Sequence, residues 1–451
     1  MGLINMYSFN NSINGFIKNL YKRNEILKKT FLFSFFLLRF LNLIISIFIN
    51  GAKSLINRVI KKKNIKIAFI GPVHSSHFKN FKMTLDKFFY KNDKKSFMYI
   101  NSYTTESTKN FSQEIIIDQG IYGFFGYFLN QKRFKRWTKD LFLKAENNLN
   151  LLNKKIILYS LRNFNPDYIW IHDLQSGGYL ADSLTEDLKR SFPKSKIVGS
   201  VWGNDLYFYY EHKLHRKKLE SILKSLDFLH GECPRDGKIA KSLGFNGKIL
   251  PCCSVTMTNI NDLENLNKSD ESQDKDIFLT IKGSYYLRSN LTYLFDEINE
   301  NIDFWKEKRV VFIGTSEEDN FRIEKINSHH GIKFEYFSWM PFDDYVGFLG
   351  RSKYHLICNY SDGILNSAAE SVFQECLPIF SRGTGLCEFL NEELISNVTY
   401  DFKNVSFIAL LTNLEDSPER HEKYLNDIRD AYICRVYNKN TYRDIFKSLE
   451  Q

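Results

Sequence analysis

Two carboxylates separated by seven residues, Asp362 and Glu370, lie in the most informative segment of the chain, residues 361–385. An apolar run before Asp362 predicts a short buried strand, and Glu370 lies about one turn into a helix expected to begin at Ser367. Carboxylates placed in this way can accept hydrogen bonds from two separate sets of hydroxyls, while backbone N–H groups between them bind a phosphate. The pattern therefore predicts a site for a ligand that carries both hydroxyls and phosphate.

Glu370 also has an explanation that involves no ligand. Ser367 and Glu370 have the Ser-x-x-Glu spacing of a capping box, in which the Glu only stabilises the start of a helix. The residues alone leave both explanations open.

The apolar runs around these residues predict an open α/β sheet. A second run, 377–380, ends in a glycine-rich loop that contains Gly383 and Thr384. Strand, loop, helix, strand and loop make one unit of such a sheet, whose ligands bind at the carboxyl ends of the strands. Further strands are predicted at 65–70, 168–171, 196–201, 277–281, 309–314 and 333–337.

Polar residues follow four of these strands at their carboxyl ends. They are His74 and His77, His172 and Asp173, then Trp202, Asn204 and Asp205 in the first half, and Lys282, Gly283 and Arg288 in the second. His74 and His77 lack a third ligand at a suitable spacing, so we expect loop histidines near a substrate and no zinc site. A histidine bonded to backbone and a helix N-cap are the alternative explanations for His172 and Asp205.

The composition predicts a large enzyme with an additional N-terminal segment. The 451 residues allow two or three domains, and 43% hydrophobic residues suffice for a sizeable core. The 7 cysteines form no Cys-x-x-Cys pair, which indicates a reduced compartment and disfavours a disulfide scaffold. The sequence contains neither G-x-G-x-x-G nor a P-loop motif, so binding of a dinucleotide or of a P-loop nucleotide is unsupported.

The positive charge is concentrated at the N-terminus. Residues 1–66 contain 12 Lys or Arg and one acid, whereas the rest of the chain holds 50 basic and 51 acidic residues. A nucleic-acid-binding protein would need basic stripes on its folded body, so this distribution favours an anionic membrane surface as partner. Residues 31–49 are long enough to span a bilayer, but Arg39 lies at their middle and begins a polar helical stripe. We expect an amphipathic helix lying in the membrane interface, and packing on the protein body is the alternative.

These features divide the chain into four parts. We expect a basic membrane-associated leader at 1–63, a Rossmann-like domain at 64–257, a polar linker at 258–276 and a second Rossmann-like domain at 277–451. The last helix can pack back on the first domain. Asp274 and Asp276 have the D-x-D spacing of a metal site, but they precede their strand and are assigned to the linker.

The chain resembles GT-B glycosyltransferases, especially the family-4 group. In residues 361–385 an acid-x7-acid pattern precedes a turn with a small residue and a proline, as in the donor-site signature of that family. The segment VWGND, 201–205, resembles its W-G-S-D motif, and His172 resembles its strand-ending histidine. The resemblance extends over about residues 65–435 and implies an α/β fold with two Rossmann-like domains facing each other across a cleft. It also implies that the first of these domains binds the acceptor and the second binds a nucleotide sugar.

The resemblance also implies roles for individual residues. Asp362 would contact the donor sugar, Glu370 the nucleotide ribose, and Lys282 with Arg288 the diphosphate. The donor site would be completed by Gly283, Gly363, Asn366, Gly383 and Thr384. His172, Asp173 and Asp362 would be catalytic, and His74, His77, Trp202, Asn204 and Asp205 would lie on the acceptor side.

The implied reaction is transfer of a hexose from a nucleotide sugar to a lipid-linked or envelope glycan, as in lipopolysaccharide synthesis. It would retain the anomeric configuration and need no metal or cofactor, because cations and helix N-termini stabilise the departing diphosphate. In an inverting reaction, His172 or His74 would be the base. The enzyme would sit peripherally on the cytoplasmic face of the inner membrane. A GT-B-like nucleotide-sugar epimerase and a non-catalytic membrane-associated scaffold are the alternatives.

Overall fold

The computed structural model describes the chain from residue 65 to residue 451, outside twelve segments. The segments left out are 72–75, 91–94, 102–113, 117–153, 156, 175–184, 208–209, 211–212, 255–274, 284–290, 360–361 and 402–405. The predicted leader, 1–63, and the predicted interfacial helix at 31–49 therefore lie outside the described residues. Among the helices that are described, none is long and apolar enough to cross a membrane.

The chain divides into two compact units. One holds the described residues up to Ser75 and from Asn92 to Ile197, and the other holds Ser76–Lys91 and Val198–Gln451.

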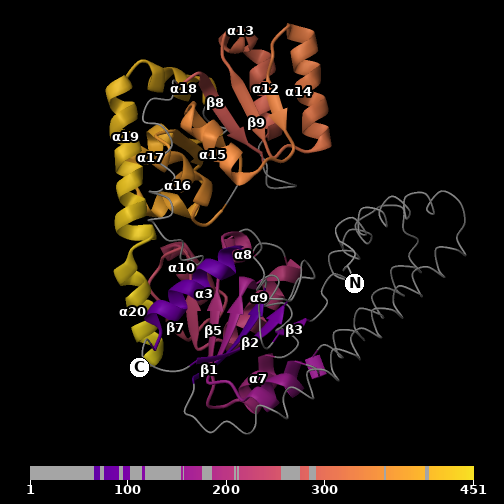
Figure 1. Ribbon diagram of the computed structural model, residues 1–451, viewed down its shortest axis with the longest axis vertical. Helices are drawn as coiled ribbons and strands as arrows, with labels where there is room; N and C mark the ends of the chain where they lie inside the picture. The colour runs from indigo at the N-terminus through magenta and orange to yellow at the C-terminus, as the bar shows by residue number, and fades with distance from the viewer. Residues whose placement is uncertain are drawn as a thin grey trace, which may run out of the picture. The chain divides into compact units, whose positions relative to one another are not determined.

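The first sheet has seven strands in the order β3-β2-β1-β4-β5-β6-β7 (Figure 1). Its central strands are continuous apolar runs, as expected for parallel strands that are covered on both faces. In β1 the residues from Ile67 to Ile70 are fully buried, and β1 pairs in parallel with both β2 and β4. The strands are β1 Ile65–Gly71, β2 Lys95–Asn101, β3 Glu114–Ile116, β4 Tyr168–His172, β5 Lys196–Ser200, β6 Phe228–His230 and β7 Lys248–Ile249. The helices among them are α3 Ser76–Phe88, α7 Thr185–Ser191, α8 Asn204–Tyr207, α9 Lys213–Ser225 and α10 Pro234–Ser242.

The second sheet has six parallel strands in the order β10-β9-β8-β11-β12-β13. They are β8 Ile277–Lys282, β9 Val310–Ile313, β10 Glu335–Phe337, β11 Ser352–Ile357, β12 Leu377–Ser381 and β13 Thr399–Tyr400. Because β9 lies on one side of β8 and β11 on the other, the strand order reverses between β8 and β11. Such a reversal opens a crevice at the carboxyl ends of the two strands, where ligands of open α/β sheets bind.

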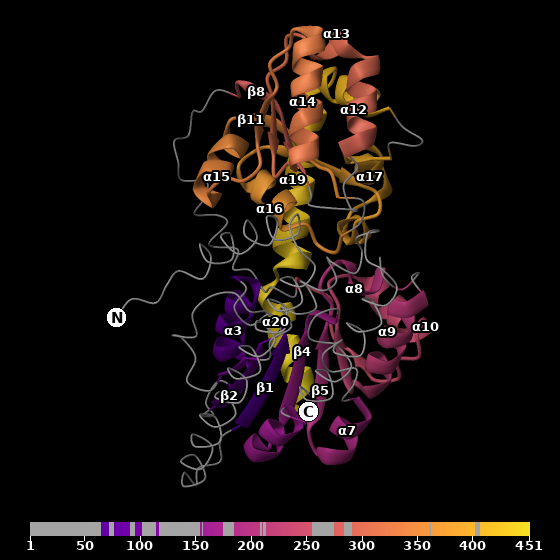
Figure 2. The ribbon, with the colours of Figure 1, turned by 90° about the vertical axis from the view of Figure 1, so that its right-hand side faces the viewer.

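Helices cover this second sheet around an aromatic core. Trp305, Phe312, Tyr354 and Phe380 are fully buried there, and Trp305 stacks on Phe407 with ring centroids 6.5 Å apart. The helices are α12 Leu291–Glu300, α13 Ile302–Trp305, α14 Glu317–His330, α15 Phe342–Gly350, α16 Asn366–Phe373, α17 Glu392–Val398, α18 Phe407–Glu415 and α19 Pro418–Ala431. Figure 2 shows α19 running beside α16 in this part of the molecule.

The chain ends in α20, Lys439–Glu450, which packs on α3. The rings of Phe446 and Phe89 lie 5.4 Å apart, and the Tyr90 N–H donates to Glu450 Oε1 at 2.7 Å. These contacts attach the C-terminal helix to a helix that lies more than 300 residues earlier in the sequence.

The predicted strands are present, and one helix start is corrected. α16 begins at Asn366 instead of Ser367, and its N-cap, Leu365, makes no side-chain capping bond. Ser367 therefore lies inside the helix and cannot form the capping box with Glu370. Asp276, the second acid of the D-x-D sequence, is hydrogen-bonded to the guanidinium groups of Arg309 and Arg351.

Candidate active site

Lys282 and Gly283 lie at the point where the strand order of the second sheet reverses. Lys282 ends β8 opposite Ile357 of β11, and its ammonium group lies 4.9 Å from the centroid of the Tyr345 ring. A Cβ on Gly283 would come within 2.9 Å of the Gly314 carbonyl oxygen, so the loops after β8 and β9 touch there. Lys282 therefore places a cation at the carboxyl end of β8, where a ligand of such a sheet is expected. Arg288, the second predicted cation, lies outside the described residues.

Glu370 carries a buried carboxylate oxygen that needs a partner. Its side chain is half-buried on α16, and within the described part of the chain Oε2 makes no hydrogen bond. Burial is the main cause that raises the pKa of Tyr345 well above its usual value, and the charge of Glu370 and a side-chain hydrogen bond with Glu370 add to this shift, so Tyr345 is in contact with this carboxylate. A buried carboxylate oxygen without a hydrogen bond costs free energy, so Oε2 is a candidate acceptor for a ligand hydroxyl. The capping-box explanation of Glu370 is wrong, because α16 begins at Asn366 with Leu365 as its N-cap.

Tyr345 is held in place by a buried histidine. The Tyr345 hydroxyl lies 3.2 Å from His355 Nε2, and His355 Nδ1 lies 3.1 Å from the Thr280 carbonyl oxygen. Burial, with the charge of Lys282, lowers the pKa of His355 to about 3, so the imidazole is neutral. With Nδ1–H donating to Thr280, Nε2 accepts the hydroxyl proton of Tyr345. The ring beneath Lys282 is therefore fixed from the interior of the sheet.

Two tyrosines fix the start of α16. The Tyr437 hydroxyl donates to Asn366 Oδ1 at 2.9 Å, and the Tyr432 hydroxyl donates to the Leu365 carbonyl at 2.6 Å. The side-chain oxygen of Asn366, which was predicted to bind the sugar donor, therefore already accepts a hydrogen bond from Tyr437.

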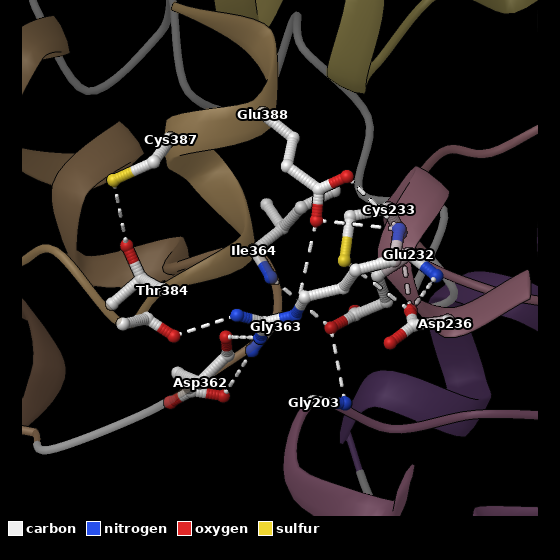
Figure 3. Close-up of polar contacts among 12 residues, drawn as sticks. Gly203, Glu232, Cys233, Asp236, Asp362, Gly363, Ile364, Thr384, Cys387 and Glu388 are labelled. Atoms are coloured by element: carbon white, nitrogen blue, oxygen red, sulfur yellow. Dashed lines mark hydrogen bonds and ion pairs between the residues drawn. The ribbon is translucent and has the colours of Figure 1, made fainter. Parts of the chain in front are cut away.

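The Asp362 loop lies beside the glycine-rich loop, as Figure 3 shows. Asp362 and Thr384 form a single parallel bridge, and the Gly385 N–H donates to the Asp362 carbonyl at 2.9 Å. The carboxylate of Asp362 accepts from Asn359 Nδ2 and from the Gly363 N–H, both at 2.9 Å. The structure therefore brings the predicted residues Asp362, Gly363, Gly383 and Thr384 together.

A buried acid that the sequence did not single out joins this cluster. Glu232 follows β6, and its Oε2 accepts from the Gly203 N–H and the Ile364 N–H, each at 3.1 Å. Burial, followed by the charges of Asp362 and Asp236, raises the pKa of Glu232 to about 8. Burial also raises the pKa of Asp236 to about 6. The signal available in the sequence was a polar turn after an apolar run, but β6 has only three residues.

The raised pKa values predict a stability that falls as pH rises. Between the ordinary pKa of a Glu and about 8, unfolded Glu232 releases its proton while the folded protein keeps it. Stability from this group is complete below pH 4 and is lost towards pH 8, and Asp236 adds a loss that ends near pH 6. Thermal unfolding followed by circular dichroism should give a lower midpoint at pH 8 than at pH 5.5. Glu232→Gln should flatten this dependence, and a profile as steep as that of the unmodified protein would contradict the assignment.

His172 and Asp173 lie in the first unit. His172 ends β4, is fully buried, and stacks on Trp170 with ring centroids 6.1 Å apart. Asp173 has a φ of 62°, a left-handed conformation that is uncommon for a residue with a side chain. Asp and Asn adopt this conformation more readily than other residues with a side chain, and here it places Asp173 directly after the carboxyl end of β4.

The other predicted acceptor-side residues are only partly described. Trp202 is half-buried after β5, while His74 lies outside the described residues. His77, Asn204 and Asp205 lie in α3 and α8, but their side chains are not among those described. Because α8 begins at Asn204, Asp205 is inside the helix and is not its N-cap. In the part of the chain that the structure describes, no group of three or more His, Cys, Asp and Glu side chains is placed to hold a metal ion.

Solved structures resemble this chain over most of its length. The N-terminal domain of trehalose-6-phosphate phosphatase from Candida albicans has a TM-score of 0.64 at 14% identity, covering 87% of this chain and 98% of that chain. Sucrose-phosphate synthase from Thermosynechococcus elongatus has a TM-score of 0.60 at 10% identity, covering 86% and 98%. The lipopolysaccharide outer core galactosyltransferase WaaB has a TM-score of 0.57 at 13% identity, covering 85% and 100%.

No family model matches the sequence, and a search of the curated proteins finds no match. The fold assignment therefore rests on the two parallel sheets and on the solved structures that share them. The chain shares the GT-B fold of these structures, as its sequence predicted.

Proposed function

We propose that this protein is a glycosyltransferase that uses a nucleotide-sugar donor. The observation that supports the proposal is the Glu370 carboxylate on α16, whose buried Oε2 makes no hydrogen bond within the described residues. A carboxylate in this position is suited to accept from the two hydroxyls of a nucleotide ribose. Lys282 would hold the diphosphate, and Asp362 would accept from hydroxyls of the donor sugar.

The chemistry requires stabilisation of a departing nucleoside diphosphate. Lys282 is placed to offset its growing negative charge, and the N-terminus of α16 adds backbone N–H donors. We propose that the reaction retains the anomeric configuration, with the leaving phosphate assisting the acceptor, and that His172 and Asp173 face the reacting centre. In an inverting reaction His172 or His74 would act as base.

The proposed acceptor is a lipid-linked or envelope glycan at the cytoplasmic face of the inner membrane. The support is the basic leader, whose 12 Lys or Arg and one acid favour an anionic surface. A soluble sugar nucleotide that is only epimerised would give no reason for such a leader.

The direct test is incubation of the full chain with a panel of labelled sugar nucleotides, with and without vesicles of extracted envelope lipids. Transfer of label to lipid is the expected result. Isomerised donor without transfer would make the protein an epimerase. An unchanged donor that also fails to bind would make it a non-catalytic scaffold.

Sugar transfer should persist in excess EDTA. Lys282 and the N-terminus of α16 are proposed to stabilise the leaving diphosphate in place of a divalent ion. The rate of sugar transfer should therefore change by less than about twofold. Loss of transfer with EDTA, restored by Mn²⁺ or Mg²⁺, would contradict this prediction. Asp276 would be an unsuitable ligand even then, because two arginines already bind its carboxylate.

A further inference from the structure

The turn between β6 and α10 binds two loops that carry predicted site residues. A single oxygen, Glu232 Oε2, accepts from Gly203 in the loop after β5 and from Ile364 in the loop after β11, both at 3.1 Å. The first loop contains Trp202, and the second contains Asp362. One buried carboxyl group thus sets the position of both backbones (Figure 3).

Arg235, in the first turn of α10, binds the backbone of the Asp362 loop and of the glycine-rich loop after β12. Its Nη1 donates to the Gly383 carbonyl at 2.6 Å, and its Nη2 donates to the Asp362 carbonyl. The guanidinium carbon lies 3.7 Å from the centroid of the Tyr207 ring, and the Arg235 N–H donates to Glu388 Oε2 at 2.9 Å. The planar fork of an arginine makes such paired bonds in one orientation only.

The turn is itself held firmly. Asp236 Oδ2 accepts from the backbone N–H groups of Glu232 and Cys233, at 2.9 and 3.1 Å.

The loops after β5 and β11 also lie close together at Gly203. Gly203 has a φ of 49°, and a Cβ built on it would come within 2.4 Å of Asp362 Oδ1. The contact between the loops therefore has little freedom to shift.

We propose that Glu232 and Arg235 are positioning residues for sugar transfer, acting by fixing the backbone of residues 362–364 so that Asp362 faces the donor sugar. The proposal rests on the proposed function. Neither side chain is required to touch the substrate. Glu232 acts as a hydrogen-bond acceptor for two amides, and Arg235 acts as a donor to two carbonyls. Because Glu232 also accepts from the Gly203 N–H, it fixes the position of the Asp362 loop relative to the loop after β5.

The test compares Glu232→Gln with Glu232→Ala in the full chain. The Gln carbonyl still accepts from both amides, so kcat should stay within about threefold of the unmodified protein. Alanine leaves two amides without their acceptor, and a loop displaced by about 1 Å should lower kcat about 100-fold. Binding of UDP, GDP or ADP, whichever the unmodified protein binds, should be unchanged in both variants, because the proposed diphosphate and ribose contacts are made by Lys282 and Glu370.

Hydrogen exchange supplies a readout that needs no sugar. In Glu232→Ala the amides of residues 201–206 and 362–366 should lose protection, whereas Glu232→Gln should retain it. Glu220 on α9, bonded to Arg216 at 3.0 Å and partly exposed, gives the matched controls Glu220→Ala and Glu220→Gln. If Glu232→Ala does not fold, Arg235→Lys replaces it, since lysine keeps the charge but loses the fork and should lower kcat at least about 10-fold.

Three results separate the outcomes. Equal loss of kcat in both Glu232 variants with unchanged exchange would overturn the positioning role, because the ionisable proton of the carboxyl group, which glutamine lacks, would then be the essential property. Lost protection with unchanged kcat would also overturn it and leave only a structural contact. If the unmodified protein transfers no sugar, the proposed function fails while loss of protection in Glu232→Ala still supports the contact itself.

Discussion

Glu370→Gln and Asp362→Asn should each lower sugar transfer at least about 100-fold while thermal unfolding changes little. Hydrogen bonds to a charged acceptor are worth about 1.5–3 kcal/mol each, and each carboxylate is proposed to accept more than one from the donor. A loss of about 2.7 kcal/mol corresponds to 100-fold in rate. α16 begins at Asn366 with Leu365 as its N-cap, so Glu370 does not cap this helix. The substitution Glu370→Gln therefore removes no capping interaction. The measurement is kcat/KM with the identified donor, together with the unfolding midpoint.

Glu375→Gln is the matched control for Glu370→Gln. Glu375 is exposed just beyond the end of the same helix, so its amide should leave transfer unchanged. A Glu370→Gln protein that loses about 1 kcal/mol of stability but keeps its turnover per folded molecule would contradict the ribose assignment.

The strands could be predicted because parallel strands covered on both faces are continuous apolar runs. The residues at 65–70 and 277–281 show this directly, and both form strands at the centre of their sheets. The candidate site residues were predicted from one rule, that ligands of such sheets bind at the carboxyl ends of the strands. Lys282 accordingly ends β8 and Asp362 follows β11, the two strands between which the order reverses.

The sequence could not decide the role of Glu370, because a one-residue difference in the helix start separates a capping box from an uncapped carboxylate. Local patterns predict helix ends only to within a few residues. The observed start at Asn366 removes one explanation, and the buried Oε2 supports the other.

The contact made by Glu232 could not be predicted for a different reason. Glu232 and Ile364 are 132 positions apart, and no motif connects them. An acid in a polar turn is usually solvated, and only the tertiary structure buries this one. The close approach of Glu232 to Gly363 could not be predicted either. A glycine in a loop usually indicates only that the backbone turns there, and it does not show which side chain packs against it.

Gly363→Ala should abolish most of the activity and destabilise the protein. A Cβ at this position would lie 1.8 Å from Glu232 Oε2 and 2.8 Å from the Gly203 Cα, and the second contact is with backbone that cannot move away cheaply. Relief of the clash requires the carboxyl group to leave the amides of Gly203 and Ile364. Two lost hydrogen bonds to a buried group cost about 2–6 kcal/mol, and the displaced Asp362 loop should lower kcat at least about 100-fold.

Gly347→Ala supplies the matched control, because a Cβ on Gly347 in α15 would meet no atom within 4 Å. That substitution should raise the free energy of unfolding by up to about 1 kcal/mol, since alanine is the better helix former, and leave transfer unchanged.

The double variant Gly363→Ala with Glu232→Ala removes the obstructing carboxyl group and should recover part of the stability lost in Gly363→Ala, although not the activity. If Gly363→Ala instead unfolds at the same temperature as the unmodified protein and transfers sugar at the same rate, the close approach of Glu232 to this loop does not exist in solution. Equal stabilities of the double variant and Gly363→Ala would mean that the clash is with the Gly203 backbone alone.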